Sequence, residues 1–81
     1  YMSLKLKIVS PEKIQYDGEV SIVTVPGTLG RFQVLQGHQP IISSLEKGVV
    51  EYIDKDGMHN IEIVGGFVEV RSDEVSLCVE M

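Results

Sequence analysis

The chain has 81 residues, of which 43% are hydrophobic and 23% are charged, and this composition predicts one folded globular domain. A domain of this length buries only about 60–65% of the surface of its unfolded chain, so we expect modest stability. Twelve acids against seven bases give a net charge of −5, which argues against nucleic acid or an anionic lipid surface as a partner.

The first quarter of the chain is predicted to form short β-strands. Residues 4–8 alternate between apolar side chains and lysines, which places the two kinds on opposite faces of a strand. The proline-containing segment 10–12 is expected to end that strand. Asp17-Gly18 precedes a second alternating run at 20–24 and predicts a hairpin turn, because both residues tolerate positive φ.

The second half of the chain also reads as strands joined by tight turns. Asp56-Gly57 and Ser72-Asp73 each separate two apolar runs and predict two further hairpins. The predicted strands of this half are residues 41–45, 49–53, 61–64, 67–70 and 75–79.

Together these patterns predict an all-β fold of about eight to ten short strands, an antiparallel two-sheet β-sandwich or flattened barrel, forming one domain over residues 1–81. No stretch shows the apolar spacing of an ordinary helix. No run approaches the roughly 20 apolar residues needed to cross a bilayer, and no secretory leader is recognised. Met2 is expected to be the initiator and Tyr1 an expression remnant.

Catalytic and metal sites are poorly supported by the sequence. The two histidines, His38 and His59, are far apart in the chain and have no paired ligand at zinc-site spacing. Cys78 is the single cysteine, which indicates a reducing compartment. It falls on the strand face opposite Leu77, so it is either a small core residue of a second layer or a partly exposed thiol. No base is recognised beside it, and we expect no catalytic residue, metal or cofactor.

The glycine clusters are interpreted as backbone geometry rather than as phosphate loops, since their spacing fits neither nucleotide fingerprint. Turns are expected at Gly27 and Gly30, and a bend or bulge at Gly65-Gly66.

Three side chains in the central glycine-rich segment have two readings each. His38, in the Gly-His-Gln-Pro turn, is either bonded to nearby backbone or displayed at a protein interface. Phe32 is either core or part of an exposed loop contact, and Arg31 is either solvated or an interface residue. Ile41 and Ile42 are expected to be exposed apolar residues beside the turn.

Two glycine motifs occur in order along the chain. The first is the run PGTLGRFQVLQGHQP at 26–40, and the second is GGFVEV at 65–70. This ordered pair resembles the β-domain of the rotary (F-type) ATP synthase epsilon subunit, and the resemblance extends from Leu4 to Val79. It implies a two-sheet β-sandwich without an active site, which couples the gamma shaft to the polar loops of the c-ring in the central stalk. It also implies a peripheral location at the cytoplasmic face of the bacterial inner membrane, without direct membrane insertion.

The resemblance assigns two surfaces to this chain. The loop facing the c-ring is expected to comprise Gly27, Thr28, Leu29, Gly30, Arg31 and Phe32. The surface that binds the gamma shaft is expected to comprise His38, Pro40, Ile42, Ser43, Val64 and Gly65.

Three departures from the family pattern accompany this assignment. Arg31 stands where many members carry an acid, so either the ring loop has changed in step or the contact is not electrostatic. Gln33 and Gln36 stand where small residues or proline are common, which concerns the detailed shape of the loop. The sequence also lacks the helical hairpin that follows this domain in most bacterial members. A protein ending at Met81 would couple without inhibiting, whereas a piece of a longer protein would have lost its inhibitory half.

Two other function classes are compatible with the residues. A general β-sandwich module could capture a peptide strand at a sheet edge, and binding of unrelated peptides would favour it. A small cysteine enzyme would require rapid modification of Cys78 at neutral pH.

Overall fold

The computed structural model describes residues 3–37 and 39–81. Within these ranges the chain forms nine strands and no helix. The strands are β1 (Leu4–Val9), β2 (Ile14–Val20), β3 (Ile22–Gly27), β4 (Gly30–Val34), β5 (Ile41–Leu45), β6 (Gly48–Asp54), β7 (Gly57–Ile63), β8 (Gly65–Arg71) and β9 (Glu74–Glu80). The all-β prediction is therefore confirmed. No helix in this described part of the chain is long and apolar enough to cross a membrane.

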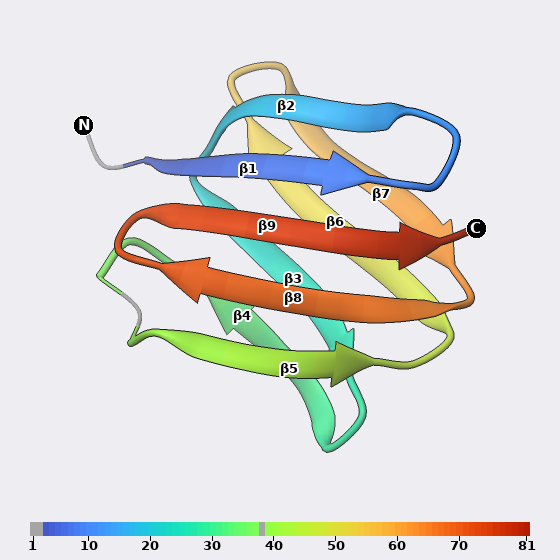
Figure 1. Ribbon diagram of the computed structural model, residues 1–81. Helices are drawn as coiled ribbons and strands as arrows, with labels where there is room; N and C mark the ends of the chain where they lie inside the picture. The colour runs from blue at the N-terminus through green and yellow to red at the C-terminus, as the bar shows by residue number, and fades with distance from the viewer. Residues whose placement is uncertain (1–2, 38) are drawn as a thin grey trace.

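The strands form two layers that cross at an angle (Figure 1). One layer has the order β2-β1-β9-β8-β5, and the other contains β4, β3, β6 and β7. The layers belong to one continuous sheet, because β3 pairs with β5 at a single residue pair, Gly27 with Leu45. This curled sheet confirms the predicted two-layer β-sandwich.

One strand pair corrects the expectation of a purely antiparallel sheet. β1 and β9 run parallel, with Lys5 opposite Glu74 and Val9 opposite Cys78. They are separated by most of the chain, so no short hairpin constrains their relative direction. Local alternation specifies the faces of each strand but not the orientation of distant partners, which explains the difference.

The core lies between the two layers and is made by the alternating apolar positions. In β1 the leucines and Ile8 are buried while Lys5 and Lys7 are exposed, as predicted. Close packing of such side chains gives the domain a stiff interior. Among the described residues, sixteen buried hydrophobic ones form this core: Leu4, Leu6, Ile8, Val20, Val23, Val25, Val34, Leu45, Val50, Tyr52, Ile63, Val68, Val70, Val75, Leu77 and Val79.

Two of the three predicted hairpins are confirmed and one is wrong. The β6–β7 hairpin turns next to Asp56-Gly57, and the β8–β9 hairpin turns at Ser72-Asp73. Asp17 and Gly18 instead lie inside β2, opposite Lys7 and Leu6 of β1. Gly18 lies against the end of the Tyr16 side chain, because a Cβ at this position would be 2.9 Å from the phenol oxygen and would displace it.

Strand β3 passes from one layer to the other at Pro26. Its first half pairs with β6, from Ile22 opposite Ile53 to Thr24 opposite Glu51. Its end joins β5 instead, since the Glu46 amide donates to the Pro26 carbonyl at 2.9 Å. This change of partner places the β3–β4 hairpin at the junction of the two layers.

Candidate interaction surfaces

The loop predicted to face a ring is the β3–β4 hairpin. Gly27 and Gly30 form its last pair, so Thr28 and Leu29 make a two-residue turn, and Gly30 adopts a φ of +133°. Glycine is favoured at such positive φ, as the sequence predicted. Leu29 is fully open to solvent at this tip and Thr28 is exposed, whereas Gly27 is buried and Phe32 packs partly on the core. The hairpin thus presents its tip and not its whole length.

Arg31 is turned back onto the domain. Its guanidinium donates to the Val49 carbonyl at 2.8 Å and lies 3.5 Å from a carboxylate oxygen of Glu51, both on β6. Both side chains of this ion pair are about two-fifths exposed, so the pair is an ordinary surface contact, but the bond to the carbonyl is a short charge-assisted one. Neither of the two readings of Arg31 anticipated this internal contact.

The residues predicted to bind a shaft at the start of β5 divide between two faces. Pro40 and Ile42 are exposed, and 73% of the Ile42 side chain is accessible. Ile41 and Ser43 alternate with Ile42 and are half-buried, and Ile41 packs against the core, so its predicted exposure is wrong. His38 lies outside the described residues.

Val64 and Gly65 lie at the other end of the same layer from Ile42. Val64 forms the bend between β7 and β8 and is 56% exposed, and Gly65 begins β8. The bend expected at Gly65-Gly66 therefore falls one residue earlier. Ile42 pairs with Glu69, five residues beyond Val64, which at ~3.3 Å per residue separates the two by roughly 17 Å. Any single partner that contacts both must span the layer.

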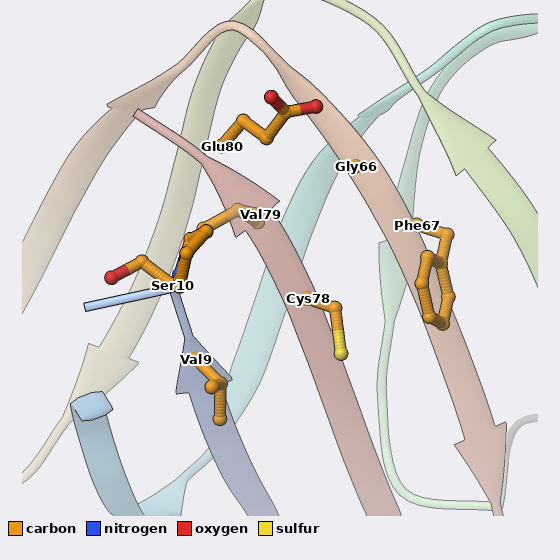
Figure 2. Close-up of a pocket in the computed structure, with 8 residues that line it drawn as sticks. Val9, Ser10, Gly66, Phe67, Cys78, Val79 and Glu80 are labelled. Atoms are coloured by element: carbon orange, nitrogen blue, oxygen red, sulfur yellow. The ribbon is translucent and has the colours of Figure 1, made fainter. Parts of the chain in front are cut away.

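The structure reveals apolar side chains between these two ends that sequence reasoning missed. Phe67 is 48% exposed and pairs with the exposed Cys78 on β9, which in turn pairs with Val9 on β1. Figure 2 shows the Phe67 ring beside the Cys78 thiol. Both residues line a hollow of about 350 Å³. The core reading of Cys78 is therefore wrong, and the exposed reading is confirmed. The alternation of Phe67 and Glu69 with Val68 and Val70 was the signal that could have placed Phe67 outside.

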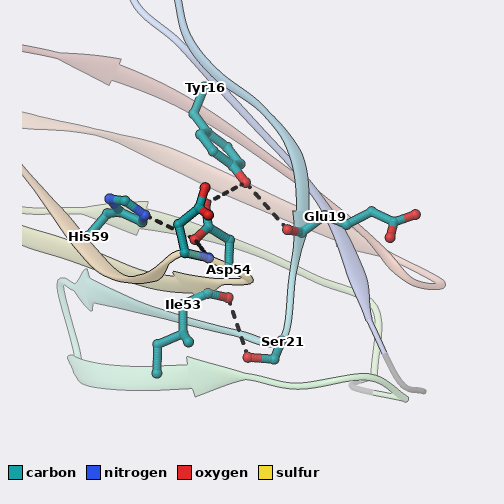
Figure 3. A network of polar contacts seen from close by, with 7 residues as sticks. Tyr16, Glu19, Ser21, Ile53, Asp54 and His59 are labelled. Atoms are coloured by element: carbon teal, nitrogen blue, oxygen red, sulfur yellow. Dashed lines mark hydrogen bonds and ion pairs between the residues drawn. The ribbon is translucent and has the colours of Figure 1, made fainter.

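A polar cluster ties the β6–β7 turn to β2 (Figure 3). An Asp54 carboxylate oxygen lies 3.0 Å from His59 Nε2 and accepts from the Asp56 amide at 2.8 Å, which stabilises the turn. The Tyr16 hydroxyl donates to the other carboxylate oxygen at 3.3 Å, and its ring centroid lies 4.5 Å from that of Tyr52. These contacts connect the two layers at the end opposite the β3–β4 hairpin.

Electrostatics in this cluster favour a charged aspartate and neutral phenols. Partial desolvation raises the pKa of Asp54, but the bonds from the Asp56 amide, His59 and Tyr16 outweigh it and the net pKa is lowered. Burial, followed by the Asp54 charge, raises the pKa of Tyr16. The described residues contain no group of three acids, histidines or cysteines able to hold a metal ion. The cluster is interpreted as a structural one.

Comparison with known proteins places the chain in a family. Residues 3–81 match the family model described as ATP synthase, Delta/Epsilon chain, beta-sandwich domain. An ATP synthase epsilon chain of Magnetococcus marinus is 44% identical over 79 residues, covering 98% of this chain and 58% of the relative. One of Leptospira borgpetersenii is 40% identical over 77 residues, covering 95% of this chain and 61% of the relative. The chain thus spans about three-fifths of the length of these relatives.

Solved structures agree on the fold. A chain of the Euglena gracilis mitochondrial ATP synthase, in a structure of its OSCP, F1 and c-ring, superposes with a TM-score of 0.92 at 21% identity, covering 100% of this chain and 52% of that one. A chain from the central stalk and c-ring of the Tetrahymena thermophila mitochondrial enzyme gives 0.80 at 15% identity, covering 96% and 63%. With the family match over nearly its whole length, the chain belongs to the β-sandwich domain family of the ATP synthase delta/epsilon chain.

Proposed function

We propose that this chain is a non-catalytic rotor subunit of an F-type ATP synthase, binding the gamma shaft and contacting the c-ring to couple ion transport to ATP synthesis. Its family supports this proposal, as do the names of its relatives and the central-stalk and c-ring context of one solved neighbour. We place it peripherally at the cytoplasmic face of a bacterial inner membrane, where the ring loops would lie.

The observation that carries the shaft assignment is the exposed apolar strip across β5 and β8. Ile42 and Phe67 lie on the same face of the layer, because their cross-strand partners are Glu69 and Ser44. Such diagonal neighbours are separated by about 7–8 Å, within reach of an aromatic side chain. Exposed apolar residues gathered on one sheet face are typical of protein interfaces. The shaft surface is proposed to comprise His38, Pro40, Ile42, Val64 and Gly65, with Phe67 added from the structure. Ser43, which the sequence assigned to this surface, alternates with Ile42 and faces the other side of β5.

The mechanism proposed is mechanical rather than chemical. Torque passes from shaft to ring only through a body that does not deform, and the buried core between the two layers supplies that stiffness. The strip on β5 and β8 would hold the shaft, and the β3–β4 hairpin would rest on the ring. No step of this coupling requires a reacting group, cofactor or metal on the domain itself.

The direct test is a calorimetric titration of the chain into the purified gamma subunit, with and without the change Ile42→Glu. A buried carboxylate would weaken binding at least tenfold, while the exposure of Ile42 predicts unchanged folding. Met58→Glu is the matched control, since Met58 is 64% exposed on β7 in the other layer and should bind like the parent.

Three results would count against this proposal in different ways. Normal binding by a folded Ile42→Glu variant would remove the face from the interface. Unfolding of that variant would place Ile42 in the core. A folded parent chain that does not bind gamma at all would contradict the rotor function and favour peptide capture at an open edge such as β7, which ends the strand order.

A further inference from the structure

We propose that the β3–β4 hairpin contacts the c-ring through the apolar side chain of Leu29, and that Arg31 is a positioning residue that braces this hairpin from inside the domain. The inference rests on the proposed function and specifies the chemistry of its ring contact. The exposed tip of the hairpin would touch the ring, whereas the charged residue that follows the tip would not.

Pro26 leaves one carbonyl of β6 without its backbone donor. The register of β3 with β6 runs from Ile22 opposite Ile53 to Thr24 opposite Glu51. Two residues further it places Pro26 opposite Val49, and a Cβ on Gly48 would lie 2.9 Å from the Pro26 Cβ, so the strands are close there. Proline has no N–H, and the carbonyl of Val49 consequently lacks its ladder donor.

Arg31 supplies the donor that the Val49 carbonyl lacks. Arg31 pairs with Pro26 in the β3–β4 register, so both side chains share one face of the sheet. Its guanidinium reaches past Pro26 and donates to the Val49 carbonyl at 2.8 Å, with Glu51 at 3.5 Å on the same side. One arginine thereby links β4 to β6 across β3, which is the geometry of a brace.

The base of the hairpin is hydrogen-bonded to β5 and to the residue that follows it. The Glu46 amide donates to the Pro26 carbonyl at 2.9 Å, and the Thr28 amide donates to the Ser44 carbonyl at 3.1 Å. With Arg31 holding one side and β5 the other, the two-residue tip is fixed relative to both layers. A fixed tip loses little conformational entropy on binding.

The charge and polarity of the residues at the hairpin tip determine what the tip can bind. Gly27, Thr28, Leu29 and Gly30 are uncharged, and Arg31 is bonded to β6. At the base of the hairpin Glu46 and Lys47 follow β5 and carry opposite charges. Leu29 is fully exposed, so the tip offers a single apolar anchor within an uncharged two-residue turn. The partner surface that fits Leu29 is apolar side-chain area exposed between the polar groups of the ring loops. The contact should therefore respond weakly to salt, which screens exposed charges but not buried apolar area.

The experiment compares the affinity of the chain for gamma alone with its affinity for a gamma–c-ring complex, and takes the ratio as the ring contribution. Leu29→Ser is expected to reduce that ratio about tenfold or more without changing binding to gamma alone. Met58→Ser, which also removes an exposed apolar side chain, is expected to leave both unchanged. Raising the salt from about 0.05 M to about 0.5 M should change the parent ratio less than about twofold.

Arg31→Met tests the brace, because it keeps an unbranched apolar stem beside Pro26 and removes the guanidinium donors. Amide exchange at Thr28 and Glu46 is expected to accelerate about tenfold or more, while the salt dependence of the ring contribution stays as in the parent. Unchanged exchange at both amides would overturn the brace. A steep salt dependence in the parent that disappears in Arg31→Met would show a charged ring contact and overturn the inference.

The remaining outcomes separate this inference from the function on which it rests. Normal binding to gamma with a ring contribution that Leu29→Ser leaves intact overturns the apolar contact and leaves the proposed function standing. Normal binding to gamma with no ring contribution overturns the apolar contact and the ring contact of the proposed function, and leaves only its shaft binding. Absence of binding to gamma and to the gamma–c-ring complex by a folded parent chain overturns both.

Discussion

Gly66 is the position where a single methyl group should do the most damage. It lies in β8 between β5 and β9, and its φ is +144°, a conformation that L-residues rarely adopt. A Cβ added there would collide with the backbone carbonyl of Cys78 and would lie 2.8 Å from the Val79 Cα. These are backbone atoms of the neighbouring strand, so no side-chain rotation can relieve the contact.

The expected cost of Gly66→Ala follows from these two effects. Holding a non-glycine residue at such a φ costs about 1–3 kcal/mol, and forcing two paired strands apart costs about 1–3 kcal/mol more. A domain of this length is stable by about 4–12 kcal/mol in total, at about 0.05–0.15 kcal/mol per residue. The variant should therefore lose between a sixth and all of its stability.

Urea unfolding followed by far-ultraviolet circular dichroism measures this loss, since the chain has no tryptophan to report by fluorescence. With a slope of about 1 kcal/mol per M, the midpoint should fall by about 2 M or more. Gly65→Ala is the matched control, because its nearest neighbour is the Leu45 carbonyl at 3.8 Å. That variant should stay within about 1 kcal/mol of the parent. Equal effects at the two glycines would refute the reasoning.

Three further predictions concern the polar cluster and the core. The lowered pKa of Asp54 adds stability above the ordinary pKa of 3.8, and this part is lost as the pH falls through the lower folded value. Urea midpoints near neutral pH and in acid should therefore differ less in Asp54→Asn than in the parent. The pKa of Tyr16 is raised above 10.0, so stability should fall as the pH rises past 10.0, and Tyr16→Phe should reduce that fall; an equal fall in both proteins would contradict this coupling. Leu77→Ala, at a fully buried position, should cost about 2–5 kcal/mol by urea titration, whereas Cys78→Ser beside it should stay within about 0.5 kcal/mol; similar costs would place Cys78 in the core.

Much of the fold was predictable because strand faces follow from local alternation. The leucines of β1 and Leu77 with its neighbouring valines were expected on one face of their strands, and they form the core. The turns at Asp56-Gly57 and Ser72-Asp73 were predictable for a related reason, since a tight turn needs particular residues at consecutive positions.

The Asp17-Gly18 prediction failed because the same dipeptide serves a different need. A glycine permits a turn, but it also permits a close approach, and here it makes room for the Tyr16 ring. The Tyr16–Asp54–His59 cluster escaped prediction because its members come from β2 and the β6–β7 hairpin, and no spacing in the sequence connects them.

The sequence by itself determined the all-β class, the faces of β1 and β9, two of the hairpins and the glycine turn that displays Leu29. Only the tertiary structure decided that β1 and β9 run parallel, that Phe67 joins Ile42 on one surface, and that Arg31 bonds to β6. The physical reason is the distance along the sequence over which each signal acts. Alternation and turn chemistry act over a few residues, whereas the partner of a strand or a guanidinium depends on which distant segments the closed core brings together.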